Sequence, residues 1–327
     1  AGFSLTAPEQ AQFLLRGTNN GRVEARLTER INNAELLAKA YTGAALRRQA
    51  HALADDIVLT ITGKKGIAQT QIVFKGANGG TSEIYVSDYD GHNAMPITQD
   101  HKLVAAPYWV PGRRVIYYTS YLRDNPDIYS QDLQTGVRKL IARYSGLNTS
   151  AAVSPDGSQV AMILSKAGSP DVWVAHADGT GLKQLTNTRE DESSPCWSPD
   201  GKTLCFTSRM RGRAELYTIP SAGGQMKRLT TIGAINTTEP DWSPDGQQIA
   251  FTALMGNFQI WTLNVQTHET KMLADGEDPS WAPNSRTLIF ARRTGSGYVL
   301  SLLDEPTKKM KDIARVSGSC SQPCWAR

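Results

Sequence analysis

No hydrophobic run in the sequence approaches the ~20 residues that a membrane-spanning helix needs. Charge of one sign is also lacking, because 35 Lys and Arg residues face 31 Asp and Glu residues and leave a net charge of only +4. The two signs are interleaved, which does not favour binding to nucleic acid or to an anionic membrane surface. We therefore expect neither a membrane span nor a nucleic-acid partner.

Catalytic motifs are missing as well. The sequence has no Gly-x-Ser-x-Gly nucleophile elbow, and no glycine-rich phosphate loop follows a strand and opens a helix. Adjacent carboxylates, as in Glu190-Asp191-Glu192 and Glu277-Asp278, are more typical of a solvated loop than of a glycosidase dyad. No two of the five histidines have zinc-ligand spacing: they are His51, His92, His101, His176 and His268. We expect no enzyme, no metal site and no cofactor.

Cysteine is scarce, with four residues in the chain. Cys196 and Cys205 flank a turn symmetrically, and a disulfide between them would require a non-hydrogen-bonded pair of a hairpin. Cys320 and Cys324 would meet only if the chain turned sharply between them. Buried free thiols are an equally good interpretation, so the sequence leaves the pairing and the redox compartment open.

What the sequence does contain is a repeated unit. Its fullest copy is 239–252, which is typical of a strand, a tight turn at Pro244, Asp245 and Gly246, and a second strand. The tryptophan of this unit, with valine in one copy, recurs at spacings of 44, 44, 45, 39 and 44 residues: Trp109, Val153, Trp197, Trp242, Trp281 and Trp325. Such a period with several strands per unit is typical of a β-propeller.

A second column of residues supports four strands per unit. About 20 residues after each tryptophan position lies an apolar pair: Ile128-Tyr129, Val172-Trp173, Leu216-Tyr217, Ile260-Trp261 and Val299-Leu300. In one unit the strands are expected at 193–198, 203–208, 214–219 and 225–230. The first unit, with strands at 71–74, 83–86 and 94–98, lacks an opening strand, which Pro323-Cys324-Trp325 can supply. We predict a mainly β fold, a six-bladed β-propeller whose C-terminal strand closes the first blade.

The first 66 residues do not follow the repeat. Strands are expected at 13–17, 23–27 and 36–41. Apolar residues three and four positions apart then predict a helix from about 46 to 61, which Thr42 caps and Gly63 ends. We predict a small N-terminal α/β domain at 1–66 and the propeller at 67–327.

Candidate functional residues lie in the loops that lead into each blade and in those joining its second and third strands. In a propeller these loops gather on one face around the central channel. Their charged and hydroxyl side chains suit a peptide or protein partner at a concave rim. The candidate partner-binding residues are Asp100, His101, Asn148, Thr149, Glu190, Asp191, Glu192, Arg209, Arg211, Thr237, Thr238, Glu239, Glu277 and Asp278. The alternative for any one of them is an ordinary solvated loop residue.

The chain resembles the TolB family, the periplasmic propeller proteins of the Tol-Pal system. The resemblance is carried by 46–57, Leu-Arg-Arg-Gln-Ala-His-Ala-Leu-Ala-Asp-Asp-Ile, by the junction 62–74, and by the Pro-x-Trp-Ser-Pro-Asp-Gly units with closing pairs such as Leu185-Thr186 and Leu229-Thr230. It covers nearly the whole chain. Relative to the family, we expect the chain to lack the first strands and the extreme tail of the N-terminal domain, where the family contacts TolA, so we do not expect that contact for this chain.

The resemblance implies a non-enzymatic scaffold in the periplasm. The scaffold would bind the peptidoglycan-associated lipoprotein (Pal) through loops such as 236–239, and other Tol proteins elsewhere, in support of outer-membrane integrity and cell division. We expect it to act as a monomer. Two alternatives are an enzyme or enzyme-accessory propeller of peptidase or lyase type, and a sensor propeller with a small ligand or ion in the channel.

Overall fold

A computed structural model describes residues 3–43, 45–295, 297–313, 316 and 318–327. The chain divides into two compact units, Ala1–Thr70 and Gln71–Arg327. Each unit has its own sheets and its own buried residues, and each is described by itself.

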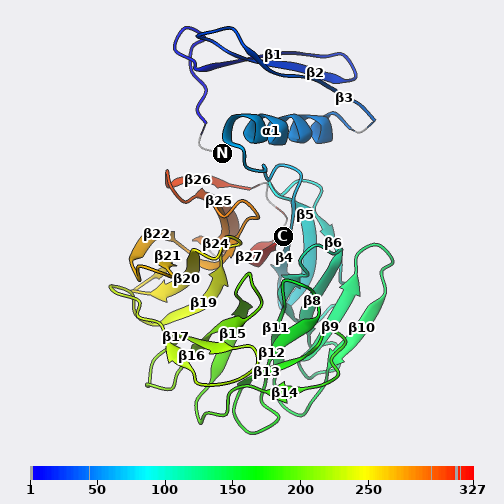
Figure 1. Cartoon of the computed structure of the whole chain (residues 1–327). Coiled ribbons are helices and arrows are strands. Elements are labelled where there is room, and N and C mark those ends of the chain that lie inside the picture. Colours follow the sequence, from blue (N-terminus) through cyan, green and yellow to red (C-terminus); the bar gives the residue numbers. More distant parts are fainter. Residues whose placement is uncertain (1–2, 44, 296, 314–315, 317) are drawn as a thin grey trace. The chain divides into compact units, whose positions relative to one another are not determined.

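The first unit is a three-stranded antiparallel sheet with one helix (Figure 1). Its strands β1 (Phe13–Asn19), β2 (Val23–Glu29) and β3 (Glu35–Tyr41) and its helix α1 (Leu46–Thr62) confirm the elements expected here. Gly63 ends the helix in a left-handed conformation, with φ of 70°, and its N–H bonds to the carbonyl of Leu59. The prediction that Thr42 caps the helix is wrong, because the N-cap position is Ala45, three residues further along.

Polar side chains fasten the helix to its sheet. Gln49 is buried and its Oε1 accepts a hydrogen bond from the backbone N–H of Val23 at 2.7 Å. The carboxylate of Asp56 accepts from the Tyr41 hydroxyl at 2.6 Å and from Lys39 Nζ at 2.7 Å. The sheet therefore presents one face to α1, with Ala25, Leu27 and Tyr41 buried.

The second unit consists of six four-stranded antiparallel sheets, or blades. The first blade has the hydrogen-bonded order β27 (Ser319–Trp325), β4 (Gln71–Asn78), β5 (Thr81–Asp88) and β6 (Met95–Pro96). The second has β7 (Val104–Trp109), β8 (Val115–Ser120), β9 (Asp127–Asp132) and β10 (Arg138–Ala142). The third has β11 (Asn148–Val153), β12 (Gln159–Leu164), β13 (Asp171–His176) and β14 (Lys183–Gln184).

The remaining three blades repeat the same order. The fourth has β15 (Glu192–Trp197), β16 (Thr203–Ser208), β17 (Glu215–Pro220) and β18 (Lys227–Arg228). The fifth has β19 (Thr237–Trp242), β20 (Gln248–Leu254), β21 (Phe258–Asn264) and β22 (Thr270–Asp275). The sixth has β23 (Glu277–Trp281), β24 (Thr287–Thr294), β25 (Gly297–Asp304) and β26 (Lys309–Asp312).

The two ends of the propeller segment share one blade. Strand β27, red in Figure 1, pairs antiparallel with β4, with Trp325 opposite Ile72 and Ser319 opposite Ala77. This confirms the predicted closure, in which the last strand occupies the edge that β4 would otherwise leave open. The prediction of six blades is confirmed by the same sheet order.

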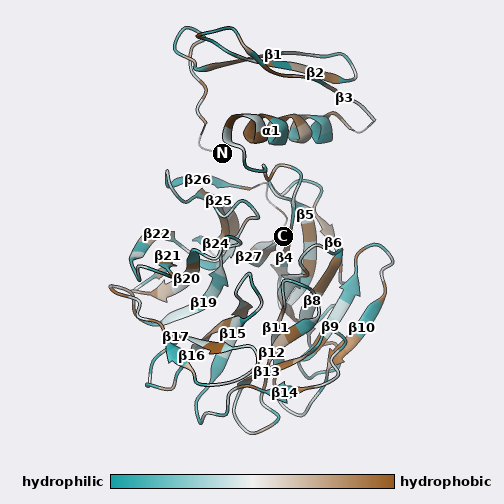
Figure 2. Ribbon diagram, viewed as in Figure 1, coloured by the Kyte–Doolittle hydropathy of each residue, from teal (hydrophilic) through white to brown (hydrophobic). Residues whose placement is uncertain are grey.

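The tryptophan column packs between neighbouring blades. Trp281 and Trp325 are fully buried, and Trp197 is 5% exposed. The indole N–H of Trp197 donates to the carbonyl of Ala152 in the preceding blade at 2.8 Å. Hydrophobic segments lie along the strands within the blades, whereas the short outer strand β14 is hydrophilic (Figure 2). Each blade is thus held to the one before it by large apolar side chains.

Candidate functional site

Every blade carries a β-bulge in its innermost strand. At each bulge one residue other than glycine adopts φ between 50° and 55°, three positions before the tryptophan column: Ala106, Ser150, Ser194, Glu239, Asp278 and Gln322. We call these six residues the bulge ring. Each lies at a register shift between the first two strands of its blade. Because left-handed backbone is costly for such residues, the surrounding structure must hold all six in place.

The bulge ring surrounds a cavity of about 190 Å³ at the centre of the propeller. All six members of the ring line it, together with the residues that follow them in the inner strands. A cavity lined by all six inner strands belongs to the central channel, and we call it the channel mouth. It is smaller than the ~300–1,000 Å³ of typical small-molecule sites.

Hydrogen bonds link the ring from blade to blade over half of its circumference. The carboxylate of Glu239 accepts from the backbone N–H of Asp278 at 3.0 Å. The carboxylate of Asp278 accepts from the N–H of Gln322, also at 3.0 Å, and the Gln322 side chain accepts from the N–H of Ala106 at 2.9 Å. The link ends at Ala106, which has no side-chain acceptor. The three bonds therefore join the fifth, sixth, first and second blades.

The acidic sector of the ring is electrostatically strained. Burial, together with the charges of Glu239 and Glu277, raises the pKa of Asp278 well above its ordinary value. Burial and the charge of Glu239 raise the pKa of Glu277 as well. Protonation of one of these carboxyl groups relieves the repulsion and provides a hydrogen-bond donor at the channel mouth.

A largely buried ion pair, Arg327 and Asp241, lies on the channel side of the tryptophan column, with side chains 21% and 15% exposed. The guanidinium of Arg327 contacts the Asp241 carboxylate and donates to the carbonyl oxygens of Trp281 and Trp242 at 3.1 and 3.3 Å. Burial raises the pKa of Asp241 even though Arg327 opposes the shift. This pair connects the closing strand β27 to the fifth and sixth blades.

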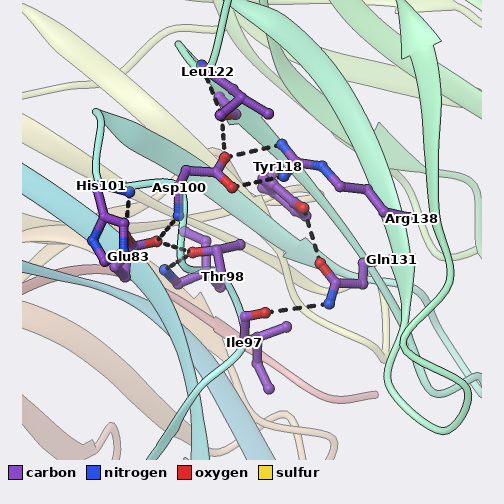
Figure 3. A network of polar contacts seen from close by, with 11 residues as sticks. Glu83, Ile97, Thr98, Asp100, His101, Tyr118, Leu122, Gln131 and Arg138 are labelled. Carbon is purple, nitrogen blue, oxygen red and sulfur yellow. Dashed lines mark hydrogen bonds and ion pairs between the residues drawn. The ribbon is translucent and has the colours of Figure 1, made fainter.

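Figure 3 shows how the loop holding Asp100 and His101 is fixed. The Glu83 carboxylate, on β5, accepts from the N–H groups of His101 at 2.8 Å and Asp100 at 3.2 Å. The Asp100 carboxylate in turn receives two hydrogen bonds from Arg138, at 2.7 and 2.9 Å, and one from Ser120. Although burial acts to raise it, these bonds lower the pKa of Asp100. The Asp100 side chain therefore fastens the first blade to the second.

Three of the expected surface residues are instead buried. Asn148, Glu192 and Thr237 are 0%, 1% and 1% exposed, and each is the first residue of an inner strand. The side-chain amide of Asn148 bonds to the backbone of its own loop: its N–H groups donate to the carbonyl oxygens of Tyr144 and Gly146, and its oxygen accepts from the N–H of Tyr144. The reason for the burial is that the start of an inner strand is covered by the loop leading into it and by the preceding blade. These three residues cannot themselves form the outer surface.

Other candidates lie on the surface of the fourth blade. Glu190, Asp191, Arg209 and Arg211 are exposed, and we call them the fourth-blade rim. Their two loops are adjacent, because the N–H of Arg209 donates to the carbonyl of Asp191 at 3.2 Å. Thr149 and Thr238 are only half-buried. The rim brings two acids and two bases together on one blade.

Sequence reasoning missed a column of carboxylates on the third strands. Glu83, Asp127, Asp171 and Glu215 each immediately precede the apolar-aromatic pair of their blade. Asp171 accepts from the hydroxyl of Thr186 and the N–H of Thr188, as Glu83 does from Thr98 and the loop at 100–101. An acid precedes the pair in the first four blades, whereas Gln259 and Tyr298 hold this position in the fifth and sixth. The recurrence in four consecutive blades was the signal that could have identified these acids.

The described part of the chain offers no group of three His, Cys, Asp or Glu side chains suited to hold a metal ion. Its one helix, α1, is too short and too polar to cross a bilayer, and no other described helix qualifies. All four cysteines are free thiols; Cys196 and Cys205 are direct partners across their hairpin, and burial raises the pKa of Cys196. The polar groups of the site are suited to recognition through hydrogen bonds and charge.

Similarity to known proteins agrees with this geometry. The family described as TolB beta propeller domain matches residues 58–327. The Tol-Pal system protein TolB of Bordetella parapertussis is 31% identical over 96% of this chain and 74% of that protein. The crystal structure of TolB from Acinetobacter baumannii superposes with a TM-score of 0.88 at 27% identity, covering 96% of this chain and 83% of that one.

A more distant likeness extends to the fold alone. An oligogalacturonate lyase from Vibrio parahaemolyticus is 14% identical, with a TM-score of 0.52 over 77% of this chain and 78% of that one. The propeller architecture is thus shared with enzymes, whereas the match to TolB proteins also includes the N-terminal unit. By the extent of these matches, the chain belongs to the TolB family of β-propeller proteins.

Proposed function

We propose that this chain is a non-enzymatic periplasmic member of the Tol-Pal system whose channel-mouth face binds Pal, the peptidoglycan-associated lipoprotein. The observation that carries the proposal is the fourth-blade rim, where Glu190, Asp191, Arg209 and Arg211 are exposed on two adjacent loops. Mixed charges on such a rim favour the specificity and rate of protein association more than its raw affinity.

Two features favour a protein partner over a small substrate. The cavity of about 190 Å³ is small for a substrate, and the carboxylates around it already accept hydrogen bonds within the ring. The loops are also pre-organised, since residues such as Glu83 hold their backbone in place. A rigid face loses little conformational entropy when a partner docks.

The proposal is tested by titrating the chain with the soluble domain of Pal from the same organism. Arg209→Glu should weaken binding severalfold and slow association, because it reverses a rim charge. Lys202→Glu is the matched control, since Lys202 is equally exposed but lies in the turn at the other end of β15. Equal effects of the two substitutions, or no binding by the unmodified chain, would refute the proposal.

A role in the cell envelope follows from the same proposal. If the chain supports outer-membrane integrity and cell division, cells carrying only the Arg209→Glu variant should leak periplasmic enzymes and divide in chains. Cells carrying Lys202→Glu should not.

A further inference from the structure

We propose that a cavity between the fourth and fifth blades is a specificity pocket for one neutral carboxamide, an Asn or Gln side chain of the docked lipoprotein. The inference rests on the proposed function and names a feature of the partner that the function alone does not specify. The cavity measures about 80 Å³ and is lined by residues that include Arg213, Glu215, Arg228, Thr231, Asn236 and Thr237. Asn236 and Thr237 belong to the region that leads into the fifth blade.

Two buried polar atoms at this cavity have no hydrogen-bond partner among the described contacts. They are Oε2 of Glu215, a residue 7% exposed whose carboxylate also interacts with the Tyr217 hydroxyl, and Oγ1 of Thr237, a residue 1% exposed. The other carboxylate oxygen of Glu215 is occupied, because it accepts from Arg228 at 2.9 Å and Arg213 at 3.4 Å. Buried polar groups in folded proteins almost always have a hydrogen-bond partner. We therefore infer that a bound group supplies partners for these two atoms.

The preceding blade junction shows one way in which the corresponding space is filled. Glu192 is the first residue of β15, as Thr237 is of β19. The Glu192 carboxylate accepts hydrogen bonds from the hydroxyls of Ser208 and Thr188, both at 2.8 Å. The polar groups at this junction therefore find their partners within the protein. Threonine has a shorter side chain and no carboxylate. We infer that threonine at this position, where the preceding junction has glutamate, leaves room for the cavity between the fourth and fifth blades.

The chemistry of the lining selects the guest. Oε2 of Glu215 needs a donor, whereas the Thr237 hydroxyl and the two guanidinium groups can serve an acceptor. A cationic guest would be repelled by Arg213 and Arg228. An anionic guest would be attracted by these two groups, but it would be repelled by the Glu215 carboxylate and has no donor for Oε2 of Glu215. A carboxamide carries a donor and an acceptor without charge, and it is small enough for a cavity of about 80 Å³. Ordered water alone is the competing occupant.

The first test removes the hydroxyl while keeping the shape of the side chain. Thr237→Val should weaken binding of the lipoprotein's soluble domain by roughly fivefold, the usual effect of losing one neutral hydrogen bond. Glu215→Gln, which replaces the acceptor by a donor, should also weaken binding. Thr207→Val is the matched control, because Thr207 carries an unpartnered hydroxyl, is 3% exposed and lies on β16 outside the cavity lining. Its affinity should be unchanged.

A second test does not depend on the lipoprotein. Acetamide is titrated into the isotope-labelled chain, and the amide resonances of residues 236 and 237 should shift in a saturable way, but not in Thr237→Val. An equal concentration of acetate or methylammonium should produce no such shift. Absence of the acetamide shift would mean that the cavity holds water only and would overturn the proposal.

The outcomes separate the two proposals. If the unmodified chain does not bind the lipoprotein, the proposed function fails, and the role of the cavity in that complex fails with it whatever acetamide does. If the chain binds and Thr237→Val binds equally well, or no worse than Thr207→Val, the pocket is refuted while the proposed function stands. Thermal unfolding of each variant identifies any that is not folded.

Discussion

The carboxylate of Glu239 accepts a hydrogen bond from the backbone N–H of Asp278, with 3.0 Å between the two heavy atoms. The two residues lie on inner strands of neighbouring blades, and the Thr252 hydroxyl donates to the same Glu239 oxygen at 2.7 Å. Both residues were expected at the binding surface. Their hydrogen bond also has a structural role, because it joins the fifth blade to the sixth beside the channel.

Removal of the Glu239 carboxylate should therefore cost stability. In Glu239→Ala the Thr252 hydroxyl loses its acceptor, and the N–H of Asp278 keeps only the longer bond to that hydroxyl, at 3.2 Å. The free energy of unfolding in urea should therefore fall by about 1–3 kcal/mol. Glu239→Gln keeps one oxygen as an acceptor and removes the charge that faces Asp278, so it should lose less or nothing. Equal losses in the two variants would show that the hydrogen bonds do not contribute.

The buried Glu192 predicts a dependence of stability on pH. Burial, opposed by the hydrogen bond from Ser208 and aided by Asp171, raises the pKa of Glu192 from 4.5 to about 7. The folded chain therefore holds a proton that the unfolded chain releases between these values. The stabilisation is complete below about pH 4.5 and is lost as the pH rises through about 7.

Thermal unfolding between pH 4.5 and 8 measures this effect. Glu192→Gln, which stays neutral, should show a smaller loss of melting temperature with rising pH than the unmodified chain. Glu190→Gln is the control, because Glu190 lies two residues away on the exposed rim. Identical pH profiles for the unmodified chain and Glu192→Gln would contradict the prediction.

Removing only one member of the Arg327–Asp241 ion pair should lower the free energy of unfolding. Arg327→Met leaves the Asp241 carboxylate buried without its cation, and the free energy of unfolding should fall by about 3–5 kcal/mol. A second substitution, Asp241→Asn, removes the unpaired charge and should restore part of the loss. Arg209→Met, at an exposed site, should change stability by no more than about 0.5 kcal/mol. If the double variant Arg327→Met/Asp241→Asn is as unstable as Arg327→Met alone, the loss of stability comes from lost packing of the Arg327 side chain and not from the unpaired charge.

The sequence was sufficient for the arrangement of the blades. The spacing of Trp109, Trp197, Trp242, Trp281 and Trp325 reports a local period, and each Ser-Pro-Asp-Gly turn closes on its own neighbours. Gly201, for example, has φ of 69° beside a Ser198 hydroxyl that bonds Asp200. Such features depend on residues close in sequence and are therefore visible in it.

The candidate site was harder to predict, because its geometry depends on contacts between blades. Polar residues such as Glu192 and Thr237 resemble surface residues in the sequence, but the preceding blade covers them. Glu239 and Asp278 precede prolines, a position that favours extended backbone, yet they adopt left-handed φ of 54° and 55°. The bulge overrides this local preference, and no local pattern reports it.

The most direct test of the account is the footprint of the lipoprotein on the chain, measured by hydrogen–deuterium exchange with and without its soluble domain. If the lipoprotein binds the channel-mouth face, we expect slower exchange in the loops 187–191 and 209–213. Protection confined to the turns 198–202 and 243–247, at the opposite ends of the inner strands, would contradict it.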